Sequence, residues 1–330
     1  MRLVSIFLIF VSVLLSNSSF ANELDDRRYI QNKVASLFMQ EKFDELNKLA
    51  NEYLRKESRT SSGVWKLTLF NAGIAQAANT RIRDEKFWDM ITEKSLRWVE
   101  KHPQSPFAHT SHAVVLVQHG WKYRGTGYAK EVKPENWEPF HDYLKKARKY
   151  LFSTKNIASR DPNWYETMLS ISTGENWSLK NFNQLVDEAI SRFPTYYQIY
   201  FTALGYMTPK WHGDKEKIEE FANRAVNRTS SKEGMGMYAR IYWFASQAQY
   251  GPRLFSDSDV VWKKMKKGID DVLSQYPDQW NINNFAFFAC AARDKNKSQE
   301  LISKIEGPPI TQAWYSMSNY NKCKSWAFVD

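Results

Sequence analysis

Apolar residues recur every three or four positions along almost the whole chain, and this period constrains the fold more than any other feature of the sequence. Between positions 42 and 56, the apolar residues at such steps are Phe43, Leu46, Leu49, Ala50, Tyr53 and Leu54. This spacing places them on one face of a helix. The alternation that is typical of strands is nowhere sustained. We therefore expect an all-α protein.

The same apolar stripe returns down the chain, and each return predicts a further helix. The predicted helices cover 65–78, 87–99, 108–121, 137–152, 182–193, 196–207, 218–226, 237–248, 260–276 and 282–292. Several end alike, with a proline before a new helix that is rich in aromatic and small residues: Pro103, Pro162, Pro194 and Pro277. Proline cannot continue a helix, but it suits the first turn of the next one.

Repeated helix, proline, helix units are typical of an α-solenoid. The helix-end prolines and small residues such as Ala108, Ala113, Ala189 and Ala225 resemble divergent tetratricopeptide repeats over most of the chain. That resemblance implies a superhelix of antiparallel helix pairs. Only the interval from Pro162 to Pro194 is near the repeat length of about 34 residues, so we expect degenerate repeats with insertions.

A second resemblance is carried by four short segments, at 120–129, 209–213, 233–243 and 285–290. Together they are similar to an uncharacterised bacterial family that carries a domain of unknown function, over roughly residues 105 to 328. This resemblance implies a related fold. It brings no activity, substrate or catalytic residue to this chain.

The first residues have the pattern of a signal peptide. Arg2 precedes an apolar run over 3–15 and a short polar stretch, and the small residues Ser19 and Ala21 suit a signal peptidase. We expect cleavage after Ala21, with one tetratricopeptide-like domain over 22–330, and leave open a subdivision near 101–105. The alternative is an uncleaved N-terminal anchor. In both cases the folded part is exported, to the periplasm or beyond, and we expect no membrane span in the mature chain.

The formal net charge of +10 makes the chain basic. Basic surfaces attract nucleic acids, anionic lipids and acidic polymers. Because export removes nucleic acid from consideration, a protein or an anionic envelope polymer is the expected partner. The simpler interpretation of the charge is a soluble surface.

Two cysteines, Cys290 and Cys323, would meet an oxidising environment after export. They could form a disulfide that pins the C-terminal segment to a helix. Alternatively, Cys290 is buried and Cys323 is exposed and free.

Catalytic and metal-binding patterns are weak. His109, His112 and His119 point to one side of a helix, but about 15 Å separates the outer two, too far for one metal ion. We expect neither a metal nor a cofactor, since nucleophile, phosphate-loop and zinc motifs are all missing. Carboxylates lie near helix starts or on polar faces, and an acid/base pair could exist among them: Asp161, Glu166, Glu175, Glu219, Glu220 and Glu233.

Two turns combine rings with glycines or a proline, and these are the predicted binding sites. The first holds Trp121, Arg124 and Tyr128, and the second holds Trp211 and His212. Loop side chains are free to contact a ligand, because no packing fixes them. The alternative is that the rings fill the junctions between helix pairs.

A third candidate group lies on the predicted helix over 237–248. Tyr238 and Tyr242 share one face, while Arg240 turns away from it. Arg240 could therefore pair with a carboxylate of a neighbouring helix or bind an acidic ligand.

These patterns favour an exported helical-repeat binding or scaffold protein, whose concave surface engages a protein partner or an envelope polymer. The alternative is a hydrolase-type enzyme that uses carboxylates and His212 at the loops of the second half. Enzymatic activity is left open, with the missing motifs against it. A cavity where His212 meets a carboxylate would favour the enzyme, and a broad groove would favour binding.

Overall fold

The computed structural model describes residues 23–125, 127, 129–209 and 213–329. The regular secondary structure in these residues is helical throughout, and they contain no β-strand, only an isolated bridge between Arg59 and Trp65. The prediction of an all-α protein is confirmed.

The helices of the first half of the chain are α1 (Glu23–Met39), α2 (Phe43–Arg55), α3 (Lys66–Ala77), α4 (Glu85–Lys101), α5 (Pro106–Arg124), α6 (Trp137–Ser153), α7 (Lys155–Ala158), α8 (Asn163–Gly174) and α9 (Leu179–Arg192). Pro103 lies between α4 and α5, and Pro162 lies between α7 and α8. Short 3-10 turns at Ala129–Glu131 and Pro134–Asn136 join α5 to α6.

The second half continues in the same way. Its helices are α10 (Tyr197–Tyr206), α11 (Lys215–Glu233), α12 (Gly236–Ala245), α13 (Leu254–Asp257), α14 (Trp262–Gln275), α15 (Gln279–Ala291), α16 (Lys295–Ile302), α17 (Thr311–Trp314) and α18 (Met317–Phe328). A π-helix at Ser246–Tyr250 directly follows α12, and a 3-10 turn at Gly251–Arg253 leads to α13.

Helix starts follow from local sequence. Ser105 caps α5, since its side chain accepts a hydrogen bond from the N–H of Ala108, and Pro106 occupies the first turn. Side chains of Asp84, Ser178, Asp214 and Asp278 cap α4, α9, α11 and α15 in the same way. Each such cap satisfies an N–H group that has no partner inside the helix.

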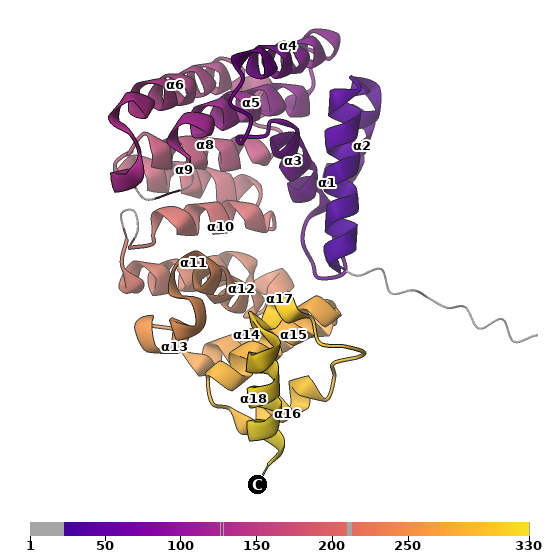
Figure 1. Cartoon of the computed structure of the whole chain (residues 1–330), viewed down its shortest axis with the longest axis vertical. Helices are drawn as coiled ribbons and strands as arrows, with labels where there is room; N and C mark the ends of the chain where they lie inside the picture. Colours follow the sequence, from indigo (N-terminus) through magenta and orange to yellow (C-terminus); the bar gives the residue numbers. More distant parts are fainter. Residues whose placement is uncertain (1–22, 126, 128, 210–212, 330) are drawn as a thin grey trace, which may run out of the picture.

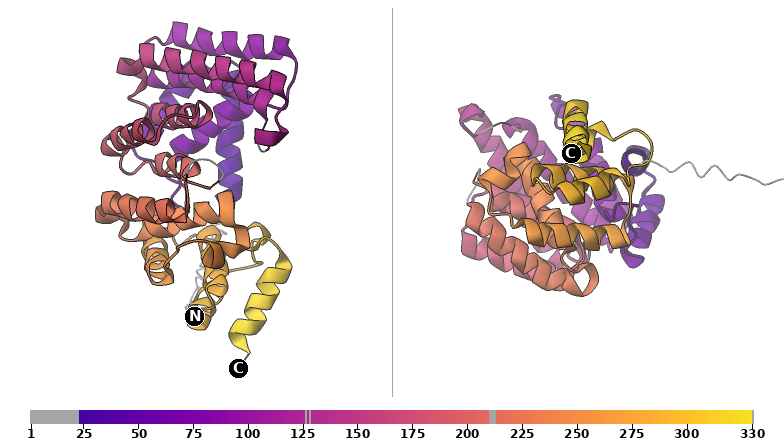
Figure 2. Two further views of the ribbon diagram at one scale, coloured as in Figure 1. Left: turned by 90° about the vertical axis from the view of Figure 1, so that its left-hand side faces the viewer. Right: turned by 90° about the horizontal axis from the view of Figure 1, so that it is seen from below.

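The helices form an elongated body, with α4 and α6 at one end and α16 and α18 at the other (Figures 1 and 2). Helix α1 packs on α3, α5 packs on both α4 and α6, and α12 packs on both α11 and α14. Helix α5 is buried over almost its whole length as a result. The turn over 102–105 interrupts neither this packing nor the apolar core, which continues from α1 to α18.

Residues 58–65, which join α2 to α3, contact residues that are more than a hundred positions later in the sequence. The indole Nε1 of Trp65 donates to the carbonyl of Thr195 at 2.5 Å, and its ring packs edge-on against Tyr196 at 5.3 Å. The carbonyl of Ser62 accepts from Arg240 at 3.2 Å and from Asn281 at 3.1 Å. The first helices are thus tied to α10, α12 and α15.

Gly63 allows this close approach. Its φ of +89° favours glycine, and a Cβ atom there would lie 2.7 Å from Nη2 of Arg240.

A disulfide joins Cys290 of α15 to Cys323 of α18, with a Cα–Cα distance of 5.9 Å. Of the two alternatives for the cysteines, the structure contains the bridge, and Cys323 is buried rather than exposed. The C-terminal helix is therefore fixed to α15. None of the helices described is long and apolar enough to cross a lipid bilayer.

Candidate functional site: a pocket enclosed by the inner helices

The first aromatic turn fills a helix junction. Trp121 packs edge-on against Phe140 at 5.2 Å, and the guanidinium of Arg124 lies over the rings of Trp121 and Trp137 at 5.0 and 5.7 Å. Arg124 also donates to the carbonyls of Gly125 and Gly127. These contacts fit the alternative that rings close the junction between α5 and α6. The remaining turn residues, Tyr128, Trp211 and His212, lie outside the described residues.

Tyr238 and Tyr242 belong to a partly buried polar cluster between α11, α12 and α14. Both hydroxyls donate to Oε2 of Glu219, at 2.7 and 2.6 Å, and Lys264 pairs with the same carboxylate at 2.7 Å. Burial opposes ionisation of Glu219, but the hydrogen bonds from Lys264 and the two tyrosines hold its pKa below the usual value. Neither tyrosine lines the pocket described below, whereas Arg240 does.

The three histidines of α5 each have a separate partner. His109 contacts the Tyr150 hydroxyl at 2.7 Å, His112 contacts the Ser95 hydroxyl at 2.8 Å, and His119 contacts Glu85 at 3.0 Å. In the part of the chain that is described, no three potential metal ligands come together.

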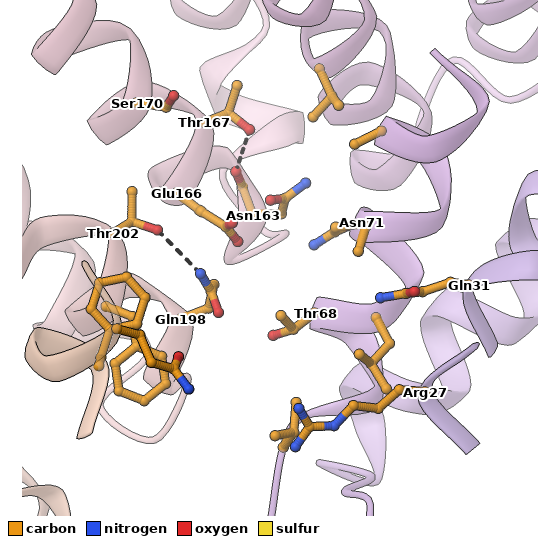
Figure 3. Close-up of a pocket in the computed structure, with 18 of the residues that line it drawn as sticks. Arg27, Gln31, Thr68, Asn71, Asn163, Glu166, Thr167, Ser170, Gln198 and Thr202 are labelled. Atoms are coloured by element: carbon orange, nitrogen blue, oxygen red, sulfur yellow. Dashed lines mark hydrogen bonds between the residues drawn. The ribbon is translucent and has the colours of Figure 1, made fainter. Parts of the chain in front are cut away.

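A pocket of about 520 Å³ lies at the centre of the body. Its walls come from α1, α3, α5, α8, α10, α12 and α15, and all of these helices except α15 contribute residues spaced three or four apart. Figure 3 shows side chains of α8 and α10 on one side and of α1 and α3 on the other, pointing into the space between them. The volume is in the range of about 300–1,000 Å³ that is typical of small-ligand sites.

Uncharged hydrogen-bonding groups make up most of the polar lining. The amides belong to Gln31, Asn71, Gln118, Asn163, Gln198, Gln247 and Asn281, and the hydroxyls to Ser62, Thr68, Thr167, Ser170 and Thr202. Within the described residues, no protein group hydrogen-bonds the side-chain amides of Gln31, Gln118, Asn163 and Gln247. Oδ1 of Asn281 is buried and also lacks a protein partner among these residues. The lining therefore has unused donors and acceptors.

Aromatic rings form part of one wall. Phe201 of α10 and Phe244 of α12 stack nearly parallel, with ring centroids 5.4 Å apart, and both are partly exposed. Trp243 packs edge-on against Phe285 at 5.4 Å and is also partly exposed. These rings give the pocket an apolar surface beside its amides.

Glu166 is the only carboxyl group among the described residues that line this pocket. Its Oε2 is enclosed and has no hydrogen-bond partner among them. Burial, together with the negative charge of Asp161, raises the pKa of Glu166 to about 8. A protonated Glu166 is thus the main form at neutral pH, and it can donate one hydrogen bond.

Asp161 lies behind the pocket wall and has a structural contact. Its Oδ1 accepts from the N–H of Asn163 at 3.0 Å, near the start of α8. Burial raises the pKa of Asp161 to about 7 in spite of this hydrogen bond.

Two arginines lie toward the opposite end from Glu166, and both have protein partners. Arg27 pairs with Glu23 at 2.5 Å and donates to Ser62 Oγ. Arg240 is 5% exposed, donates to the Ser62 carbonyl, and lies 3.9 Å from Glu233. Figure 3 shows Arg27 well separated from Glu166.

Of the predicted site residues that the structure describes, only Arg240 lines the central pocket. Glu166 was predicted only as one carboxylate among several, and none of the amides was predicted. A usable signal was present: the inner helices carry isolated amides and hydroxyls at helical steps within apolar sequence, such as Thr68 and Asn71 in α3.

Comparisons with protein-family profiles, with curated proteins and with solved structures found no significant match. The two resemblances drawn from the sequence therefore stay predictions.

Proposed function

We propose that this chain is an exported helical-repeat binding protein that encloses a segment of an envelope polymer or partner in its central pocket. The observation that carries the proposal is the pocket itself, because α1, α5, α8 and the π-helix at Ser246–Tyr250 each contribute an amide to its lining whose side chain has no hydrogen-bond partner among the described residues. Unused donors and acceptors around a small-ligand volume are the ordinary basis of specific binding.

The tetratricopeptide-like superhelix and the signal peptide belong to this proposal. Support for the superhelix comes from the alternation of inner helices such as α5, α8 and α10 with outer helices such as α6 and α9. In such stacks, the inner helices form a concave surface that binds partners. Here, the segment 58–65 contacts α10, α12 and α15, so that the concave side is a partly open pocket rather than a broad groove.

The hydrolase alternative receives less support from the pocket. Hydrolysis by carboxyl groups needs an acid and a second group that acts as base or nucleophile. Among the described lining residues, Glu166 supplies one carboxyl group, and Asp161 is enclosed behind the wall. His212, the other residue of that hypothesis, lies outside the described residues. Binding is therefore the function that we propose.

Photo-crosslinking tests whether the pocket is the binding site. Phe201 is replaced by p-benzoylphenylalanine, and the protein is irradiated with an envelope extract of the organism that produces it. We expect an adduct at this position and none when the same group replaces Phe152, which is exposed on α6 and is not part of the pocket lining. The variant Ala75→Trp, which fills the pocket from α3, should abolish the adduct while circular dichroism shows an intact fold.

Two results would overturn the proposal. One is the absence of any adduct at position 201. The other is an adduct that forms equally at position 152 or persists after Ala75→Trp, since binding would then not depend on the pocket.

A further inference from the structure

We infer that the ligand of the central pocket is a short uncharged oligosaccharide, held by the amides around its edge and by the aromatic wall against its face. This inference rests on the proposed function and adds the chemical class of the ligand. Three features of the pocket support it: the amides without hydrogen-bond partners, the aromatic rings of one wall, and the arginines that are paired with protein groups.

The side-chain amides that have no protein partner can hydrogen-bond to the hydroxyls of a sugar. A side-chain amide offers two donors and an acceptor in one plane, and a sugar hydroxyl is both a donor and an acceptor. The free amides come from opposite walls, with Gln31 on α1, Gln118 on α5 and Asn163 on α8. A ring with hydroxyls around its edge can hydrogen-bond to several walls at once. An extended peptide presents its backbone groups on two sides only.

The rings suit the other surface of a sugar. A pyranose has faces of C–H groups, which are weakly positive, and an aromatic ring has a negative face. Trp243, Phe201 and Phe244 are partly exposed within the pocket and lie on α10 and α12, beside Gln198 and Thr202. One wall therefore combines ring surfaces with hydrogen-bonding groups.

The charges of the lining are already compensated. Arg27 is paired with Glu23, and Arg240 lies near Glu233 and donates to a carbonyl, so neither offers an unpaired cation to an anionic polymer. Glu166 contributes a carboxyl group that lines the pocket and can hydrogen-bond a hydroxyl. An uncharged ligand avoids the cost of burying a charge that has no partner.

The pocket has a mouth through which a longer saccharide chain can extend. Gln247 lines the pocket and is exposed, so it lies at the mouth. It belongs to the π-helix that follows α12, and such π-helical turns are frequent at functional sites. A free amide at the mouth can contact the next sugar of a longer chain.

The test compares two probe sets on the purified protein: an array of neutral di- to tetrasaccharides and an array of tri- and tetrapeptides. We expect binding to a subset of the saccharides and to none of the peptides. Trp243→Ala should weaken saccharide binding about tenfold, whereas Trp243→Phe, which keeps a ring face, should retain most of it. Trp262→Ala is the matched control, because Trp262 lies on α14 outside the pocket lining and donates to Asp294.

Binding to peptides alone would overturn the saccharide inference and leave the proposed binding function in place. Binding to neither array would also overturn the inference, and the crosslinking at position 201 would still report separately on the pocket. Saccharide binding that is unchanged in Trp243→Ala and in Gln118→Ala would show that the saccharide sits elsewhere. Thermal unfolding of each variant identifies a loss of binding that comes only from misfolding.

Discussion

At the scale of single residues, Glu166 is unusual. A buried carboxyl group normally has hydrogen-bond partners, because an unsatisfied one costs free energy. Oε2 of Glu166 has none among the described residues, and the nearby Asp161 adds a repulsive charge. Such an arrangement is tolerated most easily when the group is neutral.

Glu166 should make the protein less stable as the pH rises. Its folded-state pKa of about 8 lies above the usual 4.5, so that the unfolded chain releases this proton at lower pH than the folded chain. The contribution to stability is full below about pH 4.5 and is lost as the pH rises through about 8. We expect Glu166→Gln to be more stable than the wild type by about 1–3 kcal/mol at pH 9, with little difference at pH 4.

Urea unfolding at pH 4, 7 and 9 measures this effect. Asp161, with a pKa raised to about 7, adds a slope of the same sign that remains in the variant. The matched control is Glu138→Gln on the exposed side of α6, which should change nothing. Equal stability of wild type and Glu166→Gln across the whole range would show that Glu166 is ionised and well solvated in the folded protein.

The pKa of Glu23 is shifted in the opposite direction to that of Glu166. It is 2% exposed, and its carboxylate accepts from the hydroxyls of Thr60, Ser61 and Ser62 and from the Ser62 N–H. Burial alone would raise its pKa, but the charge of Arg27 and the hydrogen bonds from Ser62 and Thr60 hold the pKa below 4.5. Glu23 therefore favours folding at neutral pH, and this contribution is lost as the pH falls through its lowered pKa.

At the scale of elements, Glu23 anchors the segment 58–65 to the start of α1. We expect Glu23→Gln to lower the free energy of unfolding by about 2–3 kcal/mol at pH 7, because an NH₂ group would face donors where an oxygen now accepts. Hydrogen exchange should speed up over 58–65. The control is Asp25→Asn, two residues along the same helix, whose exposed ion pair with Arg28 should contribute little. Unchanged exchange over 58–65 would mean that other contacts hold the segment.

The disulfide fixes another element, the C-terminal helix α18. The two cysteines are 33 residues apart in sequence, and closing a loop of that length removes about 3–4 kcal/mol of unfolded-chain entropy. The Cys290→Ala, Cys323→Ala double variant should lose about this much stability, and hydrogen exchange should rise mainly in α18. A reducing agent should destabilise the wild type and leave the double variant unaffected. If α18 stays protected in the double variant, packing alone fixes this helix.

The sequence predicted most elements well, because the outer helices have one apolar and one polar face. The predicted helices over 137–152 and 87–99 correspond to α6 and α4. Helix α8 was expected only as a helix after Pro162, without bounds, and its burial explains why no apolar stripe marks it: one face packs in the core, while Asn163, Glu166 and Ser170 face the pocket. Polar residues that face an internal pocket disturb the apolar stripe on which the prediction depends.

At the scale of the whole molecule, sequence patterns could not predict the pocket. Helical spacing shows which residues share a face of one helix, and it does not show which helices face one another. The prediction therefore favoured the turns near Trp121 and Trp211, where rings and glycines are conspicuous. The pocket depends instead on contacts such as the one between Ser62 and Asn281, which no local pattern encodes.

The same contacts predict how the whole chain unfolds. A helical-repeat protein in which each unit contacts only its neighbours can unfold in stages. Here, Trp65 and Ser62 tie the first helices to α10, α12 and α15, so that separate unfolding of either end must break contacts with the other. We expect one cooperative transition, in which circular dichroism and tryptophan fluorescence coincide.

Trp65→Leu tests this coupling, since it removes both the hydrogen bond to Thr195 and the ring contact with Tyr196. Its matched control is Trp164→Leu, a buried tryptophan whose indole donates to Leu151, only 13 residues away. Both variants should lose about 2–4 kcal/mol through the cavity that each creates. Only Trp65→Leu should separate the two probes into distinct transitions, because only Trp65 joins distant parts of the chain. Coincident transitions in both variants would show that the coupling runs through the continuous apolar core instead.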